Sequence, residues 1–67
     1  MEIILNNSPD TIPGDQMTIR ELLDFKRYTF KLLVIRINDH LVKPDEYDIA
    51  IVKHGDKVMV MHLISGG

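Results

Sequence analysis

The stretch GDKVMVMHLISGG, residues 55–67, decides how this 67-residue chain folds. After a glycine-containing turn, side chains alternate along a strand that we expect to run from Lys57 to about Ile64. Val58, Val60 and His62 share one face of this strand, and the opposite face carries Met59, Met61 and Leu63. Because both faces are largely apolar, we predict that this strand is a central strand of a sheet and is covered on both sides.

One helix is expected ahead of this strand, beginning after Thr18. Thr18 and Glu21 have the spacing of a capping box, in which each residue's side chain bonds the other's backbone N–H. The apolar residues that then recur at the helical period, and would face the sheet, are Ile19, Leu22 and Leu23. The spacing predicts a helix from about Ile19 to about Arg27.

Two predicted hairpins complete the fold. The strands that we expect are Ile3–Leu5, Asp10–Pro13, Leu33–Asn38 and Leu41–Val42. The turn-rich clusters Asn6–Pro9 and Asn38-Asp39 would join them in pairs. Pro44–Tyr47 is expected to form a single helical turn or a loop, since proline fits the first helical position. This order of elements predicts an α+β fold: a mixed sheet of about five strands with one main helix packed on one face.

The composition excludes several classes of function. No cysteine is present, so the chain has no disulfide, thiolate metal site or thiol nucleophile, and His40, His54 and His62 are too far apart for a local zinc motif. Eight basic and ten acidic residues give a net charge of −2, without the basic stripe of a nucleic-acid module. The apolar runs are too short to span a membrane, and the N-terminus lacks a signal peptide's basic flank. We therefore expect a cytoplasmic protein with no metal, no nucleic-acid partner and no membrane contact.

Four segments carry a resemblance to a known family over nearly the whole chain. They are Ile3–Asn7, Thr18–Leu23, Ile37–Val42 and the run from Gly55-Asp56 to Gly66-Gly67. In this order they resemble the ubiquitin-like sulfur carriers of the ThiS type. That family's pattern has an Ile/Val strand ending in Asn-Gly, then Thr-Val-x-Glu-Leu-Leu, Val/Ile-Asn-Gly-x-x-Val, and Gly-Asp-x-Val leading to Gly-Gly. The resemblance implies a β-grasp domain over residues 1–64 and a flexible Ser-Gly-Gly tail over residues 65–67.

The sequence departs from the family's pattern in three places. Asn6-Asn7 and Asn38-Asp39 replace Asn-Gly, which is conservative because Asn and Asp tolerate the left-handed conformation. Val42-Lys43-Pro44 replaces Val-Pro-Arg, with Tyr47 where the family often has Trp. These differences leave the implied fold unchanged and the pathway open.

The resemblance implies that the carboxylate of Gly67 is the working group. An E1-like adenylating enzyme would join it to AMP with ATP, and a sulfur donor protein would convert it into a thiocarboxylate. Thiazole synthase, in thiamine biosynthesis, would then accept the sulfur. Gly66 and Gly67 lack a β-carbon and could enter a narrow channel. The protein would be a co-substrate without catalytic residues or a bound cofactor.

Two alternatives stay open. One is a sulfur carrier for another acceptor, such as molybdopterin, an amino acid or a metallophore, and the other is a ubiquitin-like modifier or binding module. Ser65-Gly66-Gly67 after Leu63-Ile64 favours the thiazole type, because the Pro-Pro-x-x-Gly-Gly end frequent in molybdopterin carriers is absent. His62 lies three residues before Ser65, but no acid is placed to orient it, so we interpret it as a strand residue and not a catalyst.

The faces of the last strand suggest where a partner binds. By parity, Val58 and Val60 should join Ile3, Leu5, Ile35 and Ile37 under the helix. Met59, Met61 and Leu63 would then lie on the opposite face, beside Ser65 and the tail. Exposed apolar patches mark interaction sites and methionine adapts to different surfaces, so we expect these residues to bind the adenylating enzyme. The alternative is that the segment Pro44–Val52 covers this face.

Overall fold

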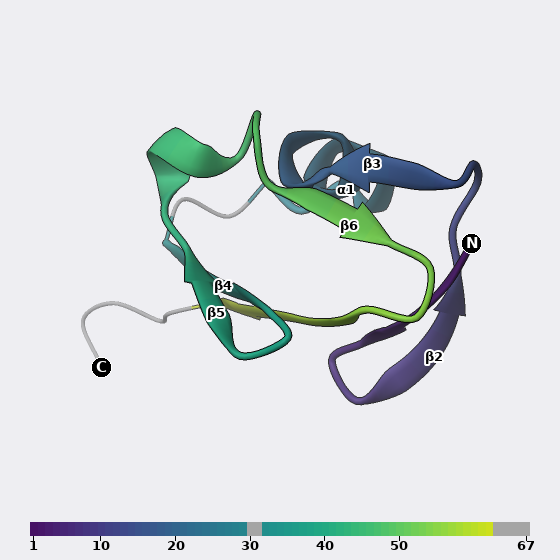
Figure 1. Cartoon of the computed structure of the whole chain (residues 1–67). Coiled ribbons are helices and arrows are strands. Elements are labelled where there is room, and N and C mark those ends of the chain that lie inside the picture. The colour runs from purple at the N-terminus through teal and green to yellow at the C-terminus, as the bar shows by residue number, and fades with distance from the viewer. Residues whose placement is uncertain (30–31, 63–67) are drawn as a thin grey trace.

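The computed structural model describes residues 1–29 and 32–62, and it shows the predicted α+β architecture (Figure 1). A five-stranded mixed sheet has the order β2-β1-β7-β4-β5, formed by Ser8–Thr11, Glu2–Leu5, Lys57–His62, Leu33–Ile37 and His40–Val42. A separate two-stranded sheet pairs β3 (Gln16–Thr18) with β6 (Ile51–Lys53). The remaining elements are helix α1 (Ile19–Lys26) and a 3₁₀ turn at Pro44–Glu46. The predicted fold class is confirmed.

Strand β7 lies at the centre of the five-stranded sheet, as predicted, but no described element covers the face that carries Met59 and Met61. It runs parallel to β1, with Leu5 opposite Val58, and antiparallel to β4, with Leu33 opposite His62. The pairing with β1 is short, whereas the pairing with β4 extends along β7 from Val58 to His62. The strand that leads toward the C-terminal residues is therefore held mainly by β4 over its second half.

The N-terminal hairpin is tighter than the sequence predicts. Asn6 and Asn7 both have positive φ, 51° and 68°, and form a two-residue turn between Leu5 and Ser8. Turns of this primed geometry match the twist of paired strands, so the second strand begins at once. The predicted hairpin is confirmed, but its turn is Asn6-Asn7 instead of Asn6–Pro9, and its second strand is Ser8–Thr11 instead of Asp10–Pro13. Pro9 is accommodated because β2 is an edge strand, where a missing N–H need not serve a neighbour.

Helix α1 begins and ends as its sequence signals predict. The Thr18 hydroxyl accepts from the Glu21 N–H at 3.0 Å, and the Thr18 N–H donates to the Glu21 carboxylate at 2.9 Å, which confirms the capping box. Arg27 adopts the left-handed conformation at φ 58°, so the helix itself ends at Lys26. The Tyr28 N–H then donates to the Leu23 carbonyl at 2.8 Å, which satisfies one of the last helical carbonyls.

The sequence analysis did not predict the sheet of β3 and β6. Gln16 lies opposite Lys53, and the Ile19 N–H donates to the Ala50 carbonyl at 2.9 Å, so β6 lies beside the start of α1. The predicted helical turn after Pro44 is confirmed, and Tyr47 behind it is buried in the core. The segment from residue 44 to residue 53 therefore belongs to the helix side of the molecule. The alternative in which it covers the face of Met59 and Met61 was wrong.

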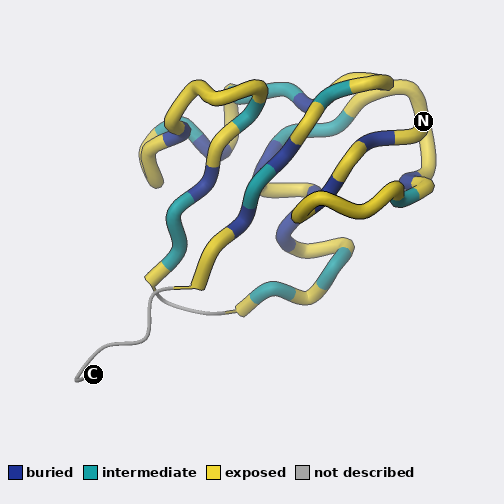
Figure 2. The backbone as a smooth tube through the Cα atoms, turned by 90° about the horizontal axis from the view of Figure 1, so that it is seen from below, coloured by how far each residue is buried: buried dark blue, intermediate teal, exposed yellow. Residues whose placement is uncertain are grey.

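The core fills the space between the five-stranded sheet and the layer formed by α1, β3 and β6 (Figure 1). Its buried side chains are Ile3, Leu5, Ile12, Ile19, Leu22, Leu23, Ile35, Val42, Tyr47, Val52, Val58 and Val60. The residues predicted to lie under the helix are among them, except Ile37, which is partly buried against the core. Figure 2 shows buried and exposed residues alternating along the strands, the period expected of a sheet covered on one face.

An ion pair ties the end of α1 to the edge strand β2. Lys26 Nζ lies 2.7 Å from a carboxylate oxygen of Asp10, and the two side chains are 26% and 29% exposed. The hydrogen bond to Asp10 raises the pKa of Lys26 above its ordinary value, and this effect outweighs the opposing effect of burial. The charged form of Lys26 therefore stabilises the folded state.

The contribution of this ion pair should disappear at high pH. A raised lysine pKa means that the stabilisation is fully present below the ordinary value of 10.5 and is lost as the pH rises through the folded-state value. Replacing Lys26 by Met should cost about 0.5–1 kcal/mol at neutral pH and less above pH 10.5. Urea unfolding of both proteins at each pH measures this difference. Lys43→Met is the control, since exposed Lys43 makes no ion pair within residues 1–29 and 32–62, and an equal pH trend in both variants would contradict the assignment.

Candidate functional site

The candidate site has two parts, and the structure describes one of them. Met59 and Met61 lie on the central strand β7. Leu63, Ser65, Gly66 and Gly67, which the sequence analysis assigned to partner binding and to the reactive tail, lie outside the described residues. The geometry of the site is therefore that of the strand from which the tail follows and of the sheet face around it.

Met59 and Met61 occupy the sheet face opposite the helix. Their neighbours Val58 and Val60 are buried in the core, so alternation directs both methionines to the outer face. Met61 is 39% exposed and Met59 is partly buried. In register, Met59 lies opposite Arg36 of β4 and Met61 opposite Val34. The placement predicted from parity is the one that the structure shows.

Other apolar residues extend this surface across the sheet. Leu41 of β5 lies opposite Arg36 and is 57% exposed, and Ile4 of β1 is 37% exposed. We call the resulting surface the outer patch, which consists of Ile4, Val34, Leu41, Met59 and Met61. No described element covers it, since α1, β3 and β6 lie on the other side of the sheet (Figures 1 and 2). Clustered exposed apolar residues of this kind are typical of protein-binding surfaces.

Two cationic side chains, Arg36 and Lys57, lie beside apolar residues of the outer patch. Exposed Arg36 lies between Leu41 and Met59 in the register of the sheet, and exposed Lys57 lies opposite Ile4. Both alternate with buried neighbours and share the outer face. An apolar surface bordered by carboxylates would complement this arrangement in both shape and charge.

The sequence analysis missed three members of the outer patch, Ile4, Val34 and Leu41, and the cations Arg36 and Lys57 beside them. Ile4 stands between the inward residues Ile3 and Leu5, so its outward direction could have been read from alternation. Its position beside Lys57, two residues before Met59 on β7, however, depends on the parallel pairing of β1 with β7. That pairing joins residues more than fifty positions apart, and the strand pattern alone does not specify it.

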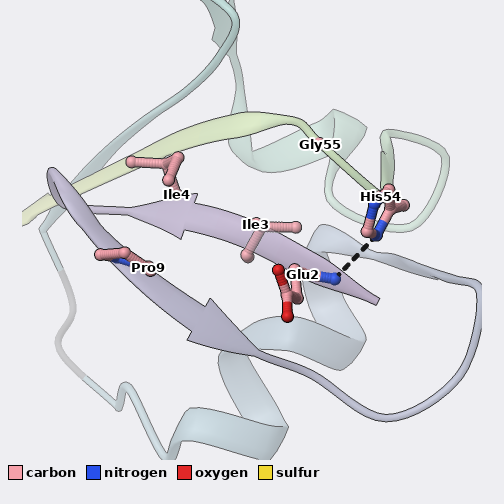
Figure 3. A pocket seen from close by; sticks show the side chains of 6 residues that line it. All are labelled: Glu2, Ile3, Ile4, Pro9, His54 and Gly55. Atoms are coloured by element: carbon pink, nitrogen blue, oxygen red, sulfur yellow. Dashed lines mark hydrogen bonds between the residues drawn. The ribbon is translucent and has the colours of Figure 1, made fainter.

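A shallow pocket lies beside the turn before β7, at the opposite end of this strand from His62 (Figure 3). Its volume is about 270 Å³, and it is lined by Glu2, Ile3, Ile4, Pro9, His54 and Gly55. His54 Nδ1 accepts the Glu2 N–H at 3.0 Å, and the Gly55 N–H donates to the Glu2 carbonyl at 2.7 Å. These bonds join the turn before β7 to the start of β1. The pocket gathers none of the described residues that the sequence analysis assigned to the site.

Within residues 1–29 and 32–62, no group of three or more His, Asp or Glu side chains is arranged to hold a metal ion. His62 is an exposed residue at the end of β7, as interpreted from the sequence, while Ser65 lies outside the described residues. None of the described helices has the length and apolar character needed to cross a membrane.

Comparisons with known proteins agree with this architecture. The chain is similar to the crystal structure of the thiamine biosynthesis protein ThiS from Geobacter metallireducens, with a TM-score of 0.88, 25% identity and coverage of 100% of both chains. It is also similar to the NMR solution structure of a thiamine biosynthesis protein from the same organism, with a TM-score of 0.80, 25% identity, and coverage of 100% of this chain and 88% of the other. A comparison with curated proteins gives no match.

A family model decides the assignment. The model of the ThiS family matches residues 3–67, which include all of the sheet except Glu2, the helix and both C-terminal glycines. The β-grasp fold expected from the sequence is confirmed by the match in structure. The chain therefore belongs to the ThiS family, whose members are small sulfur carrier proteins.

Proposed function

We propose that this protein carries sulfur on the carboxylate of Gly67, as a C-terminal thiocarboxylate, for the formation of the thiazole of thiamine. The observation that carries the proposal is the extent of the family match, which runs through Gly66 and Gly67 to the last residue. A shared fold alone would not point to the tail, because folds host many functions. The thiamine biosynthesis proteins among the similar structures support the choice of pathway.

The proposed reaction has two steps on the Gly67 carboxylate, both catalysed by partners. In the first, a carboxylate oxygen attacks the α-phosphorus of ATP and displaces pyrophosphate, giving an acyl adenylate. In the second, hydrosulfide released from a sulfur donor protein attacks the carbonyl carbon and displaces AMP. The product is a thiocarboxylate, which an acceptor enzyme such as thiazole synthase then consumes. We expect these steps to take place in the cytoplasm, with ATP bound by the adenylating enzyme and no cofactor bound by the carrier.

Intact-mass spectrometry tests the proposal. The protein is incubated with ATP, an E1-like adenylating enzyme of the thiamine type and a sulfur source. A mass gain equal to the replacement of one oxygen by sulfur is expected, and omission of ATP should prevent it. An unchanged mass, or attachment of the chain to lysine side chains, would contradict the carrier function. Transfer of the sulfur to thiazole synthase rather than to a molybdopterin-type acceptor would identify the pathway.

We further propose that the outer patch binds the adenylating enzyme, together with Leu63 and Ser65 from the segment after β7. Met59 and Met61 of the patch lie on the strand that leads to Gly67, so an enzyme bound there contacts the end of the sheet that the tail follows in the sequence. Its exposed apolar residues provide area to bury, and Arg36 and Lys57 provide charges that orient the approach of an acidic partner surface.

Placing a charge in the outer patch should weaken this interaction. The Met61→Asp variant would bury a carboxylate in an apolar interface, and we expect the KM for the carrier in the adenylation assay to rise about tenfold, with kcat unchanged. The matched control is Ile49→Asp. Ile49 is 72% exposed and lies between the 3₁₀ turn and β6, on the helix side of the molecule. Equal KM values for the two variants, with both proteins folded, would exclude the outer patch as the docking surface.

A further inference from the structure

The side chain of Asn6 bonds directly to the strand that leads to the tail. Its Oδ1 accepts the N–H of Val60 at 2.8 Å, across a separation of 54 residues in the sequence. The backbone N–H of Asn6 donates to the Val58 carbonyl at 2.9 Å. Asn6 therefore contacts two successive positions on the β1 side of β7, one with its backbone and one with its side chain.

This contact begins where the backbone pairing of β1 with β7 stops. The parallel register ends with Leu5 opposite Val58, and the chain then reverses through Asn6 and Asn7 into β2. The hydrogen bond of the Val60 N–H is partly buried, so loss of its acceptor would leave that N–H poorly satisfied. The amide oxygen of Asn6 is that acceptor and extends the hold on β7 by two residues.

A second asparagine makes the same kind of contact on the opposite side of β7. Asn38 opens the two-residue turn between β4 and β5, with φ 48°. Its N–H donates to the Lys57 carbonyl at 2.8 Å, and its Oδ1 accepts the Lys57 N–H at 2.9 Å. Asn38 thus holds the beginning of β7 and Asn6 holds its second half. Of the two, Asn6 is nearer to the C-terminal residues along the strand.

We infer that Asn6 is a positioning residue for the tail: it holds the β1 edge of β7 at Val60, while β4 pairs the other edge, and so steadies the strand that leads to the tail. This inference rests on the proposed function of Gly67. Gly67 is five residues beyond His62 and seven beyond Val60. Without the Asn6 bond, β7 is held at Val60 from the β4 side alone, so its end should separate from the sheet more readily and leave the adenylating enzyme more of the strand to order. Ordering extra residues weakens binding without changing the chemistry at the bound carboxylate.

Three variants separate this role from the role of Asn6 in the turn. Asn6→Gly keeps a residue that adopts positive φ but removes the side-chain acceptor. Asn6→Asp keeps an acceptor in the same place, and Asp also tolerates the left-handed conformation. Asn7→Gly changes the neighbouring turn residue, whose φ is 68°, into the glycine that such turns favour at this position, and it is the matched control.

Amide hydrogen exchange and adenylation kinetics of the full chain provide the two measurements. In Asn6→Gly we expect exchange of the Val60 amide to be about tenfold faster than in Asn7→Gly, because the hydrogen bond is lost. Exchange of the Ile19 amide, which donates to the Ala50 carbonyl on the helix side, should be the same in both. The KM for the carrier should rise about threefold in Asn6→Gly with kcat unchanged, and Asn6→Asp should restore both values.

Each other outcome overturns a specific part of the inference. Equal acceleration at Val60 and Ile19 would mean that Asn6→Gly lowers global stability rather than releasing β7. Equal exchange at Val60 in the two glycine variants would exclude the hydrogen bond as a hold on the strand. Faster exchange at Val60 with an unchanged KM would exclude the effect on the tail. Absence of adenylation in the unmodified protein would overturn the proposed function itself, while the exchange measurements would still test the contact.

Discussion

Removing Gly67 is expected to abolish adenylation and sulfur loading while leaving the fold unchanged. The shortened chain would still end in a glycine carboxylate, but that carboxylate would lie one residue, about 3.3–3.6 Å, short of its place in the enzyme. A displacement of about 1 Å from the reactive geometry costs on the order of a hundredfold in rate, so a shift of this size should leave no measurable product. The described core residues end at Val60, so thermal unfolding should be unaffected.

A second protein separates the length of the tail from its chemistry. A semisynthetic chain ending in the amide of Gly67 keeps the full length but lacks the carboxylate that attacks ATP. It should bind the adenylating enzyme as a competitive inhibitor without forming an adenylate. Adenylation of the chain that lacks Gly67, or of the amide, would show that the reacting group lies elsewhere and would contradict the proposed function.

Local signals in the sequence were sufficient for most of the fold. The capping box of Thr18 and Glu21 acts over three residues, and both of its hydrogen bonds are present. Asn38-Asp39 has the positive φ values that a two-residue turn requires, so the hairpin of β4 and β5 forms as predicted. The two apolar faces of β7 were enough to predict its central place in the sheet, because the apolar content of each face is a property of the strand itself.

What could not be predicted depends on contacts between distant segments. β3 and β6 are three residues long, too short for a periodic signal, and their pairing joins Gln16 to Lys53. The early start of β2 at Ser8 depends on Asn6 and Asn7 both adopting the left-handed conformation, which Asn favours less strongly than Gly. Each of these features is stabilised by its surroundings rather than by its own sequence.

The same distinction applies to the candidate site. The outward direction of Met59 and Met61 follows from parity with Val58 and Val60, and the structure agrees. The inclusion of Leu41 in the outer patch depends on the register across three strands, β5, β4 and β7. The hydrogen bond between Asn6 and Val60 also depends on contact between distant segments, because the sequence around a turn asparagine does not show which strand its side chain bonds. The direction of Met59 and Met61 could be predicted from β7 alone, but the extent of the outer patch depends on how the strands of the sheet pair.

Replacing Ile35 by Ala should remove a large part of the stability of this domain. Ile35 is fully buried at the centre of β4, opposite Val60 on one side and Val42 on the other. Truncation of a buried isoleucine to alanine costs about 2–5 kcal/mol, through lost burial and through the cavity that remains. A domain of this size has a free energy of unfolding of roughly 3–10 kcal/mol in total. The cost of this one substitution is therefore comparable with the lower end of that range of unfolding free energies. No disulfide compensates for the loss, because the chain has no cysteine.

Urea unfolding of a matched series measures the effect. Ile35→Val should cost only about 0.5–1.5 kcal/mol because it leaves a smaller cavity, and Ile49→Ala should cost far less than Ile35→Ala because Ile49 is 72% exposed. At each urea concentration, adenylation of the Ile35→Ala protein should fall in proportion to its unfolded fraction, and it should return as the urea is lowered and the protein refolds. The reason is that Ile35 faces the core and not the outer patch. A cost for Ile35→Ala no larger than that for Ile35→Val would mean that the two layers are not packed tightly around β4. Loss of adenylation in a fully folded Ile35→Ala protein would instead mean that the core transmits its packing to the strand that presents the tail.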